Sequence, residues 1–555
     1  MFTTPPSHCC NIGVFLLSYT SLAFGIFVAI VAILYFNFPV KKYQWTVLLA
    51  ASYFFYLYAG YRYAAYILIT TVSTYYAALW IDRIAARSKE TLKAHKADWD
   101  KDQKKEFKAK TKQTKQLIVT ATVVLNLGIL AFLKYYNFLS GSLNELLFAV
   151  NASFRAPELK LILPLGISFY TFQSVGYVID VNREKVAAEK NFAKVALFVC
   201  YFPQIIQGPI SFYDQLAHQL YEPHSFDFTR FKHGAELILW GLFKKLVIAD
   251  RAYIAIKTVL GDYHSYSGTV LTFVVLLYAL QLYTDFSGGI DISRGVSQIL
   301  GIELAQNFRR PYFATNINDY WRRWHITLGA WMKEYVFYPL ALSKSFTGFT
   351  KKIKGTKFGA TKAGTHIAKV LPTSFASLVV FFLVGIWHGA NWKYVAFGLW
   401  NGGIIMLSTL LEPVFEEITR KLRINTKNPL FILFQILRTF VVVAVGYVFD
   451  VAADFADSMY TFRKILTDQH ISWHIPRAVL ELNIVDYILL IICTLVLFAV
   501  SFVQEKHPDK SLRVMFDNKP FLVRYLLLLI GITMIMHFGI YGPLFDPAAF
   551  VYMQF

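Results

Sequence analysis

Two histidines stand within long apolar stretches of this chain, where an ionisable side chain is costly and therefore marks a functional hypothesis. His325 lies in the sequence YWRRWHI (residues 320–326), and His388 lies in GIWHGAN (residues 385–391). Imidazole exchanges a proton near neutral pH, so it suits general acid and base catalysis. The two positions together predict chemistry carried out within a membrane.

A structural explanation exists beside the functional one for each histidine. The segment 320–335 is predicted to be a helix with Trp321, Trp324 and His325 on one face, at positions i, i+3 and i+4. Its tryptophans and arginines are also typical of an interfacial aromatic belt with basic anchors. His388 precedes Gly389, which would let another chain or a ligand approach the imidazole, but it equally fits a histidine hydrogen-bonded between helices.

Asp285 and Asp291 flank a short glycine-containing segment directly after an apolar run. This pattern predicts a helix break whose carboxylates pair with the arginines of residues 309–323, and it favours structural ion pairs over a catalytic role. No pair of histidines at i and i+4 with a nearby acid occurs there, so no metal site is predicted. No phosphate-binding glycine loop and no Gly-x-Ser-x-Gly nucleophile elbow is present either.

The elements that must position these residues are membrane helices. Of the 555 residues, 56% are hydrophobic and only 16% are charged, against about 25% charged in ordinary soluble domains. Apolar runs such as residues 15–36 approach the ~20 residues that cross a bilayer, and lipid requires their backbone to pair internally as helices. The sequence therefore predicts an all-α polytopic integral membrane protein.

The formal net charge of +20 is concentrated in a few hydrophilic loops. Loops rich in lysine and arginine are typical of the cytoplasmic side, where they attract anionic membrane lipid, so no nucleic-acid partner is expected. We expect eleven to thirteen membrane helices in all. The chain is expected to divide into five regions: N-terminal helices (1–81), a charged cytoplasmic loop (82–116), a core with re-entrant segments (117–343), a basic cytoplasmic loop (344–369), and a second core region with His388 (370–555). The charged loop is expected to be a solvated hairpin or partly disordered.

Several stretches together resemble membrane-bound O-acyltransferases, of the bacterial branch that includes alginate O-acetylases and, more distantly, teichoic acid D-alanyl transferases. The stretches are LLAASYFFY (48–56), LPLGISFYTFQ (163–173), FPQIIQGPI (202–210), GLFKK (241–245), DFSG (285–288), WRRWHI (321–326), GIWHGA (385–390) and YMQF (552–555). The long basic insert 344–369 and the pair Phe449-Asp450, where relatives tend to carry an aromatic residue and arginine, depart from the pattern.

The resemblance implies a ring of membrane helices with re-entrant segments around a central tunnel, with His388 at its narrow centre and His325 as the second characteristic histidine. Trp324, Trp387, Asn391, Tyr320 and Asp285 are expected along this substrate tunnel. His388 would act as general base on an acceptor hydroxyl. His325 would orient the acyl group or donate to the oxyanion, while the tryptophans exclude water.

The activity implied is O-acetyl transfer by a multi-pass protein of the bacterial cell membrane. The donor would be a cytoplasmic acyl thioester, acetyl-CoA in the first instance, with no bound cofactor. The acetyl group would pass through an extracytoplasmic partner protein to hydroxyls of a cell-surface polysaccharide. Three alternatives stay open: D-alanyl transfer to teichoic acid, acylation of a lipid, and a transporter that moves a solute past the buried charges.

Overall fold

The computed structural model describes residues 17–151, 154–470, 481–541 and 550. Every regular element in these ranges is helical, which confirms the predicted all-α class. The closing stretch 552–555, which contributed to the resemblance, lies outside them. The chain divides into two compact units, one comprising Met1–Ile238 and Ile290–Ala305, the other Leu239–Gly289 and Gln306–Phe555.

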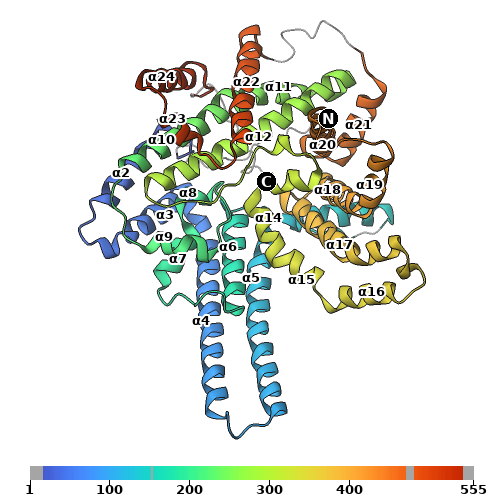
Figure 1. Cartoon of the computed structure of the whole chain (residues 1–555). Helices are drawn as coiled ribbons and strands as arrows, with labels where there is room; N and C mark the ends of the chain where they lie inside the picture. Colours follow the sequence, from blue (N-terminus) through green and yellow to red (C-terminus); the bar gives the residue numbers. More distant parts are fainter. Residues whose placement is uncertain (1–16, 152–153, 471–480, 542–549, 551–555) are drawn as a thin grey trace. The chain divides into compact units, whose positions relative to one another are not determined.

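Long helices dominate the first unit (Figure 1). They are α2 (Leu22–Phe36), α3 (Trp45–Gly60), α4 (Ala64–Ala94), α5 (Lys101–Ala149), α6 (Ile167–Asn182), α7 (Phe192–Cys200), α8 (Phe202–Ile205), α9 (Tyr213–Tyr221) and most of α10 (Phe228–Leu242). Figure 1 shows α4 and α5 side by side as a long hairpin. The charged region 82–116 therefore forms the hairpin that was one of its two predicted states.

Local sequence explains the tip of this hairpin. The Asp100 side chain accepts a hydrogen bond from the Gln103 backbone N–H at 2.7 Å, and the Gln103 side chain accepts one from the Asp100 N–H at 3.0 Å, which makes a capping box. At the other end of the charged region, Glu184 pairs with Lys89 at 2.8 Å and with Lys115 at 3.1 Å. These pairs link both helices of the hairpin to the residues that follow α6.

The second unit contains the end of α10, the π-helical segment Phe243–Ala249, and the helices that carry both histidines. These helices are α11 (Asp250–Gly261), most of α12 (Gly268–Ile299), α13 (Ile317–Arg323), α14 (Ile326–Met332), α15 (Tyr338–Ala341), α16 (Lys344–Lys354), α17 (Lys362–His388), α18 (Trp392–Leu410), α19 (Glu412–Lys421), α20 (Pro429–Val451), α21 (Phe455–Thr467), α22 (Ile484–Lys506), α23 (Leu512–Asp517) and α24 (Phe521–Phe538). The predicted basic loop 344–369 is thus largely helical, in α16 and the start of α17.

Fewer helices than expected are long and apolar enough to cross a membrane. The described ranges hold seven such helical segments, or eight if the bent pair α18 and α19 forms one span. The expected number, eleven to thirteen, was higher for three reasons. Helices α3 and α4 form one continuous helical segment, residues 41–94. The first apolar run gives a described helix of only 15 residues, α2, and α7 has only nine residues. The chain is nonetheless a multi-pass membrane protein.

Glycines allow α17 and α18 to pack closely. A Cβ added to Gly385 would lie 2.3 Å from the Tyr394 carbonyl oxygen, and one added to Gly398 would lie 2.4 Å from the Phe381 carbonyl oxygen. Small residues at a helix interface let two backbones approach, which is how membrane helices gain packing energy without a hydrophobic driving force. Because Gly385 lies one turn before His388, this contact also fixes the position of the histidine.

The variant Gly385→Ala should lower the free energy of unfolding by about 1–3 kcal/mol, because the added methyl group overpacks the helix contact. Gly403→Ala in α18 is the matched control, since a Cβ there meets nothing within 4 Å. That control should be neutral or stabilising by up to about 1 kcal/mol, because alanine favours a helix over glycine. Thermal unfolding in detergent measures both, and equal effects would refute close packing at Gly385.

Candidate active site

The candidate site is built on a break in the helix that the sequence predicted over residues 320–335. That prediction is wrong: α13 ends at Arg323 and α14 begins at Ile326. Between them Trp324 is extended, and His325 adopts φ 45° and ψ 54°, a left-handed conformation that is uncommon for a residue other than glycine. The expected shared helix face of Trp321, Trp324 and His325 therefore does not form.

The segment 307–309 stabilises this break by taking up the backbone groups that the helix would have paired. The Ile326 N–H donates to the Asn307 carbonyl at 3.0 Å, and the Arg309 N–H donates to the Arg323 carbonyl at 2.9 Å. The Asn307 side-chain oxygen also accepts from the backbone N–H and the hydroxyl of Thr327, each at 2.9 Å. These partners are distant in sequence, so periodicity alone did not reveal the break.

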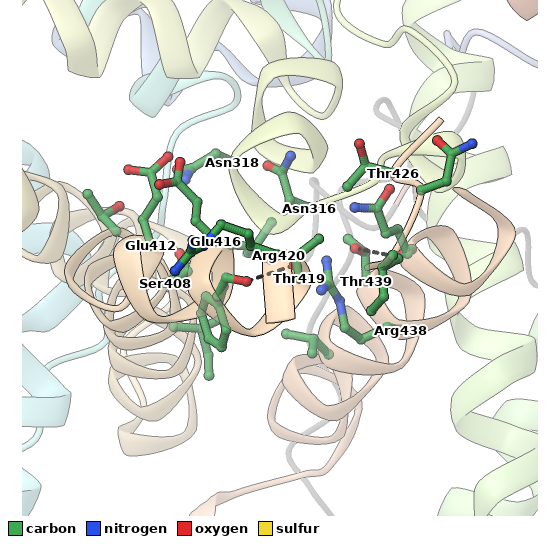
Figure 2. A pocket seen from close by; sticks show the side chains of 18 of the residues that line it. Asn316, Asn318, Ser408, Glu412, Glu416, Thr419, Arg420, Thr426, Arg438 and Thr439 are labelled. Carbon is green, nitrogen blue, oxygen red and sulfur yellow. Dashed lines mark hydrogen bonds between the residues drawn. The ribbon is translucent and has the colours of Figure 1, made fainter. Parts of the chain in front are cut away.

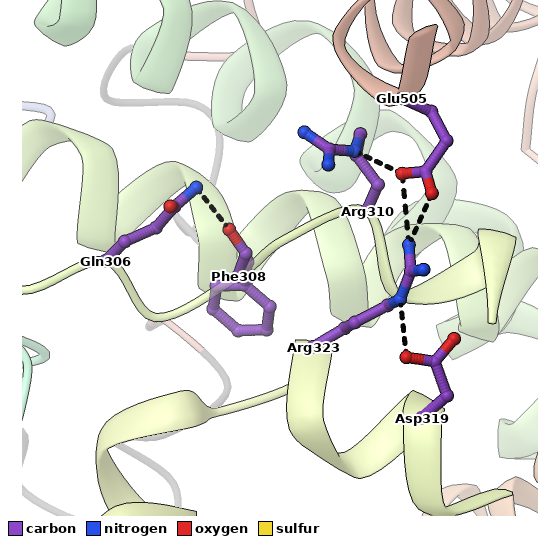
Figure 3. A network of polar contacts seen from close by, with 6 residues as sticks. All are labelled: Gln306, Phe308, Arg310, Asp319, Arg323 and Glu505. Carbon is purple, nitrogen blue, oxygen red and sulfur yellow. Dashed lines mark hydrogen bonds and ion pairs between the residues drawn. The ribbon is translucent and has the colours of Figure 1, made fainter. Parts of the chain in front are cut away.

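An ion network holds the end of α13 (Figure 3). Glu505, on α22, pairs with Arg310 at 2.6 Å and with Arg323 at 3.0 Å, and Arg323 also pairs with Asp319 at 3.0 Å. Isolated ion pairs at partly exposed positions contribute little to stability, whereas a network in which charges share partners holds its side chains in place more strongly. The side chain of Arg323 is thus held from two helices immediately before the break.

His325 is almost fully buried, with 2% of its surface exposed. Its Nδ1 lies 3.3 Å from the Asn307 side-chain oxygen, and its ring meets Phe286 and Trp387 edge-on at centroid distances of 4.9 and 5.7 Å. Burial lowers the pKa of this imidazole well below its ordinary value, and the neighbouring His388 lowers it further. His325 is therefore neutral at physiological pH.

His388 is the last residue of α17, as the end of the apolar run predicted, and 6% of its surface is exposed. Its ring lies 5.3 Å from the rings of both Trp387 and Phe397. Trp387 thus contacts both imidazoles, so the structure brings the two predicted histidines together around one indole. A Cβ on Gly389 would lie 2.2 Å from the Tyr394 ring, which shows that this glycine makes room for an aromatic side chain of the same chain.

Three of the other predicted tunnel residues lie in two places, Trp324 and Tyr320 beside the break and Asn391 at the start of α18. Trp324 stacks on Tyr320 at 5.7 Å, and the Tyr320 hydroxyl lies 2.6 Å from that of Tyr447. The Asn391 side chain caps α18 by accepting from the Lys393 backbone N–H at 3.0 Å. Trp324 and Tyr320 therefore form a buried layer next to the break, whereas Asn391 has a local structural partner.

The helix break predicted between Asp285 and Asp291 is wrong, because α12 continues to Ile299. Asp285 pairs with Lys245 at 2.6 Å, and Asp291 pairs with Arg294 at 3.5 Å. The prediction of structural ion pairs is confirmed, but their partners are not the arginines of 309–323. Because α12 is unbroken, Asp291 finds its partner on the next turn of the same helix, whereas Asp285 pairs with Lys245 on the π-helical segment 243–249.

A buried ion triad, which the sequence patterns did not predict, supports the two histidines. Lys245 lies between Asp285 and Asp250, at 2.6 and 2.8 Å, and all three side chains are at most 2% exposed. Asp285 precedes Phe286, which contacts His325, so the triad fixes the part of α12 that packs against the imidazole. Adjacent lysines in an otherwise apolar run were the available signal.

The described residues include no group of three or more histidine, cysteine, aspartate or glutamate side chains placed to hold a metal ion. The two buried imidazoles instead lie among aromatic rings and amide groups. This environment suits proton exchange and the exclusion of water from a polar reaction.

Replacing Lys245 with methionine should destabilise the protein by about 3–5 kcal/mol, because it leaves two buried carboxylates without their cation. Lys257→Met on α11 is the control, since Lys257 is exposed and should change the free energy of unfolding by less than about 0.5 kcal/mol. Thermal unfolding in detergent gives both values. A Lys245→Met variant as stable as the wild type would rule out the triad.

The depressed pKa of His325 predicts a pH-dependent stability. Below about pH 6.5 the unfolded chain binds a proton that the buried imidazole does not, so acid favours unfolding. The free energy of unfolding of the wild type, compared with that of His325→Gln, should fall by up to about 1.4 kcal/mol for each pH unit below 6.5. Unfolding midpoints between pH 5 and 8 test this, with exposed His507→Gln expected to leave the wild-type slope unchanged; parallel curves for wild type and His325→Gln would contradict it.

A family model described as MBOAT, the membrane-bound O-acyltransferase family, matches residues 183–353. This interval contains Asp285, Tyr320, Trp324 and His325, while Trp387, His388 and Asn391 follow it. The match therefore covers the break and the ion triad, and the second histidine lies on the α17 helix that continues beyond it.

Curated relatives from bacteria match a larger part of the chain. A probable alginate O-acetylase of Azotobacter vinelandii is 30% identical over 391 residues, which are 68% of this chain and 66% of the relative. A peptidoglycan O-acetyltransferase of Helicobacter pylori is 32% identical, covering 55% of this chain and 57% of the relative. A teichoic acid D-alanyltransferase of Bacillus subtilis is 26% identical, and the match covers 52% of this chain and 69% of the relative. This chain thus spans just over half to about two thirds of these relatives' lengths.

Proposed function

Because this chain belongs to the membrane-bound O-acyltransferase family, we propose that it transfers an acetyl group from a cytoplasmic thioester to hydroxyls of an extracytoplasmic envelope polysaccharide. The observation that supports this most directly is the pair of buried imidazoles, His325 and His388, in contact with one tryptophan. The names of the acetyl-transferring relatives favour acetyl over D-alanyl, and polysaccharide over lipid.

In the proposed reaction, His388 acts as general base. It accepts the proton of the acceptor hydroxyl while the hydroxyl oxygen forms a bond to the acyl carbon. The carbon–sulfur bond of the thioester then breaks, and the proton passes from His388 to the leaving thiolate. Trp387 excludes water from this step, because hydrolysis of the thioester would compete with transfer.

The geometry favours a positioning role for His325 over an oxyanion donor. The Asn307 oxygen accepts from Thr327, so it is an acceptor, and the nearby Nδ1 of His325 carries the proton of the neutral ring. Nε2 then has a lone pair and can orient an acceptor hydroxyl, but it has no proton for an oxyanion. This tautomer disfavours donation to the oxyanion, and the orientation that it allows is that of the acceptor hydroxyl and not, as the sequence suggested, that of the acyl group.

The donor is proposed to be acetyl-CoA and to be used as a substrate, without a resident cofactor. Coenzyme A thioesters are made in the cytoplasm and the polymer lies outside, so the acetyl group must cross the bilayer. An extracytoplasmic partner protein is proposed to receive the group before it reaches the polysaccharide. The lysine-rich hairpin of α4 and α5 is proposed to face the cytoplasm, by the positive-inside rule.

Replacing His388 with alanine should reduce acetyl transfer by about 10²–10⁴-fold, because the general base is removed. The full chain in lipid nanodiscs, with acetyl-CoA and a soluble oligosaccharide as a surrogate acceptor in place of the partner protein, allows thiol release and product mass to be measured together. His366→Gln is a control in the same helix, and it should retain wild-type turnover. Wild-type rates in folded His388→Ala, or solute flux without thiol release in liposomes, would refute the assignment.

A further inference from the structure

A cavity of about 1100 Å³ lies in the second unit, between the ends of α18 and α19 and the first half of α20, beside α13 (Figure 2). Ligand pockets usually occupy about 300–1,000 Å³, so this one has room for a sizeable molecule. Amide and hydroxyl side chains line it, among them Asn316, Asn318, Ser408, Thr409 and Thr439. The cavity shares none of the residues assigned to acyl transfer.

The cavity is rich in arginine. Its lining includes Arg322, Arg420, Arg423 and Arg438, against two acids, Glu412 and Glu416. Figure 2 shows both acids at one end, near Ser408, and Arg438 with Thr439 at the other. The two glutamates therefore do not balance the charge of the four arginines in the lining.

Two of these guanidinium groups are available to a ligand. Arg420 pairs with Glu417 at 2.7 Å, and Arg438 donates to the Thr315 carbonyl at 2.9 Å. Arg322 and Arg423 make neither an ion pair nor a side-chain hydrogen bond with any residue that the structure describes. A guanidinium presents a planar fork of donors that matches the oxygens of a phosphate group.

The cavity lies beside candidate membrane spans. Helix α20 is one of them, and α18 with α19 forms a bent pair that is either a broken span or a re-entrant segment. The cavity is lined by the end of α18 and the first half of α20. Helix α19 carries exposed apolar side chains, Val414, Phe415 and Ile418, followed by basic residues, which is typical of a helix lying in the lipid interface. Basic pockets between membrane helices at this level bind phosphorylated headgroups.

We propose that this cavity is a phosphate-recognition site in which Arg322 and Arg423 bind a phosphate ester. Apolar members of the lining, Ile404 and Val442, contact the carbon portion of the ligand, and the amides bind its polar groups. The phosphate comes from one of two sources, the headgroup of an anionic phospholipid or the nucleotide end of a soluble thioester donor. The assignment concerns binding, and only its second source, the thioester donor, rests on the proposed function.

The test uses the full chain with Arg322→Gln, Arg423→Gln and the double variant. Both positions are exposed and without partners in the described part of the chain, so the variants should fold. Arg463→Gln, an exposed arginine of α21 outside the cavity, is the matched control. One arm measures binding of coenzyme A and of its dephospho form by calorimetry. The other measures retained phosphatidylglycerol against phosphatidylcholine by native mass spectrometry.

Each substitution should weaken binding of the true ligand by about tenfold, because a hydrogen bond to a charged group is lost. Weaker coenzyme A binding, with a smaller effect on the dephospho form, supports the proposal and identifies the soluble source. Loss of phosphatidylglycerol alone supports it and identifies the lipid source. Wild-type binding in both arms, or equal losses in Arg463→Gln, overturns it.

Acetyl transfer measured in the same preparations separates this inference from the proposed function. Turnover together with unchanged binding in both arms would overturn the cavity assignment and leave acyl transfer standing. Binding that depends on the arginines, without turnover in any preparation, would support the cavity assignment and overturn the proposed acyl transfer.

Discussion

The arrangement of the candidate site depends on one interruption of the backbone, at Trp324 and His325. A helix through these residues would have placed the imidazole on a regular face and left the groups of segment 307–309 without their partners. Instead, left-handed backbone at His325 is stabilised by hydrogen bonds from Ile326 and Thr327 to Asn307. The cost of such a conformation is of order 1–3 kcal/mol, so it persists only where its surroundings determine it.

The same hydrogen bonds connect structure to chemistry. The Asn307 side-chain oxygen lies in hydrogen-bond contact with the Thr327 N–H, the Thr327 hydroxyl and the Nδ1 of His325, so it holds the start of α14 beside the imidazole. From the other direction, the Lys245 triad holds Asp285 and so places Phe286 against the same imidazole. Close packing at Gly385 positions His388. Three supports, on separate segments of the chain, thus converge on the two imidazole rings around Trp387.

The class of the protein and the burial of both histidines could be predicted from the sequence, because long apolar runs and the rare ionisable residues within them are local signals. The end of α17 at His388 was also predictable, since glycine and alanine follow it. The break at His325 was not, because tryptophan and arginine spacing fits a helix and the competing partner, Asn307, lies 18 residues away. The partner of Asp285 was missed for the same reason, as Lys245 is 40 residues distant.

The buried Lys245 has a consequence for acyl transfer. An uncharged amine beside an acyl group would compete as a nucleophile and become acylated itself. Lys245 is held between the carboxylates of Asp250 and Asp285. This pairing favours the ammonium form, which is not a nucleophile. The ion triad thereby keeps an amine buried beside Phe286 and His325 in a form that cannot be acylated.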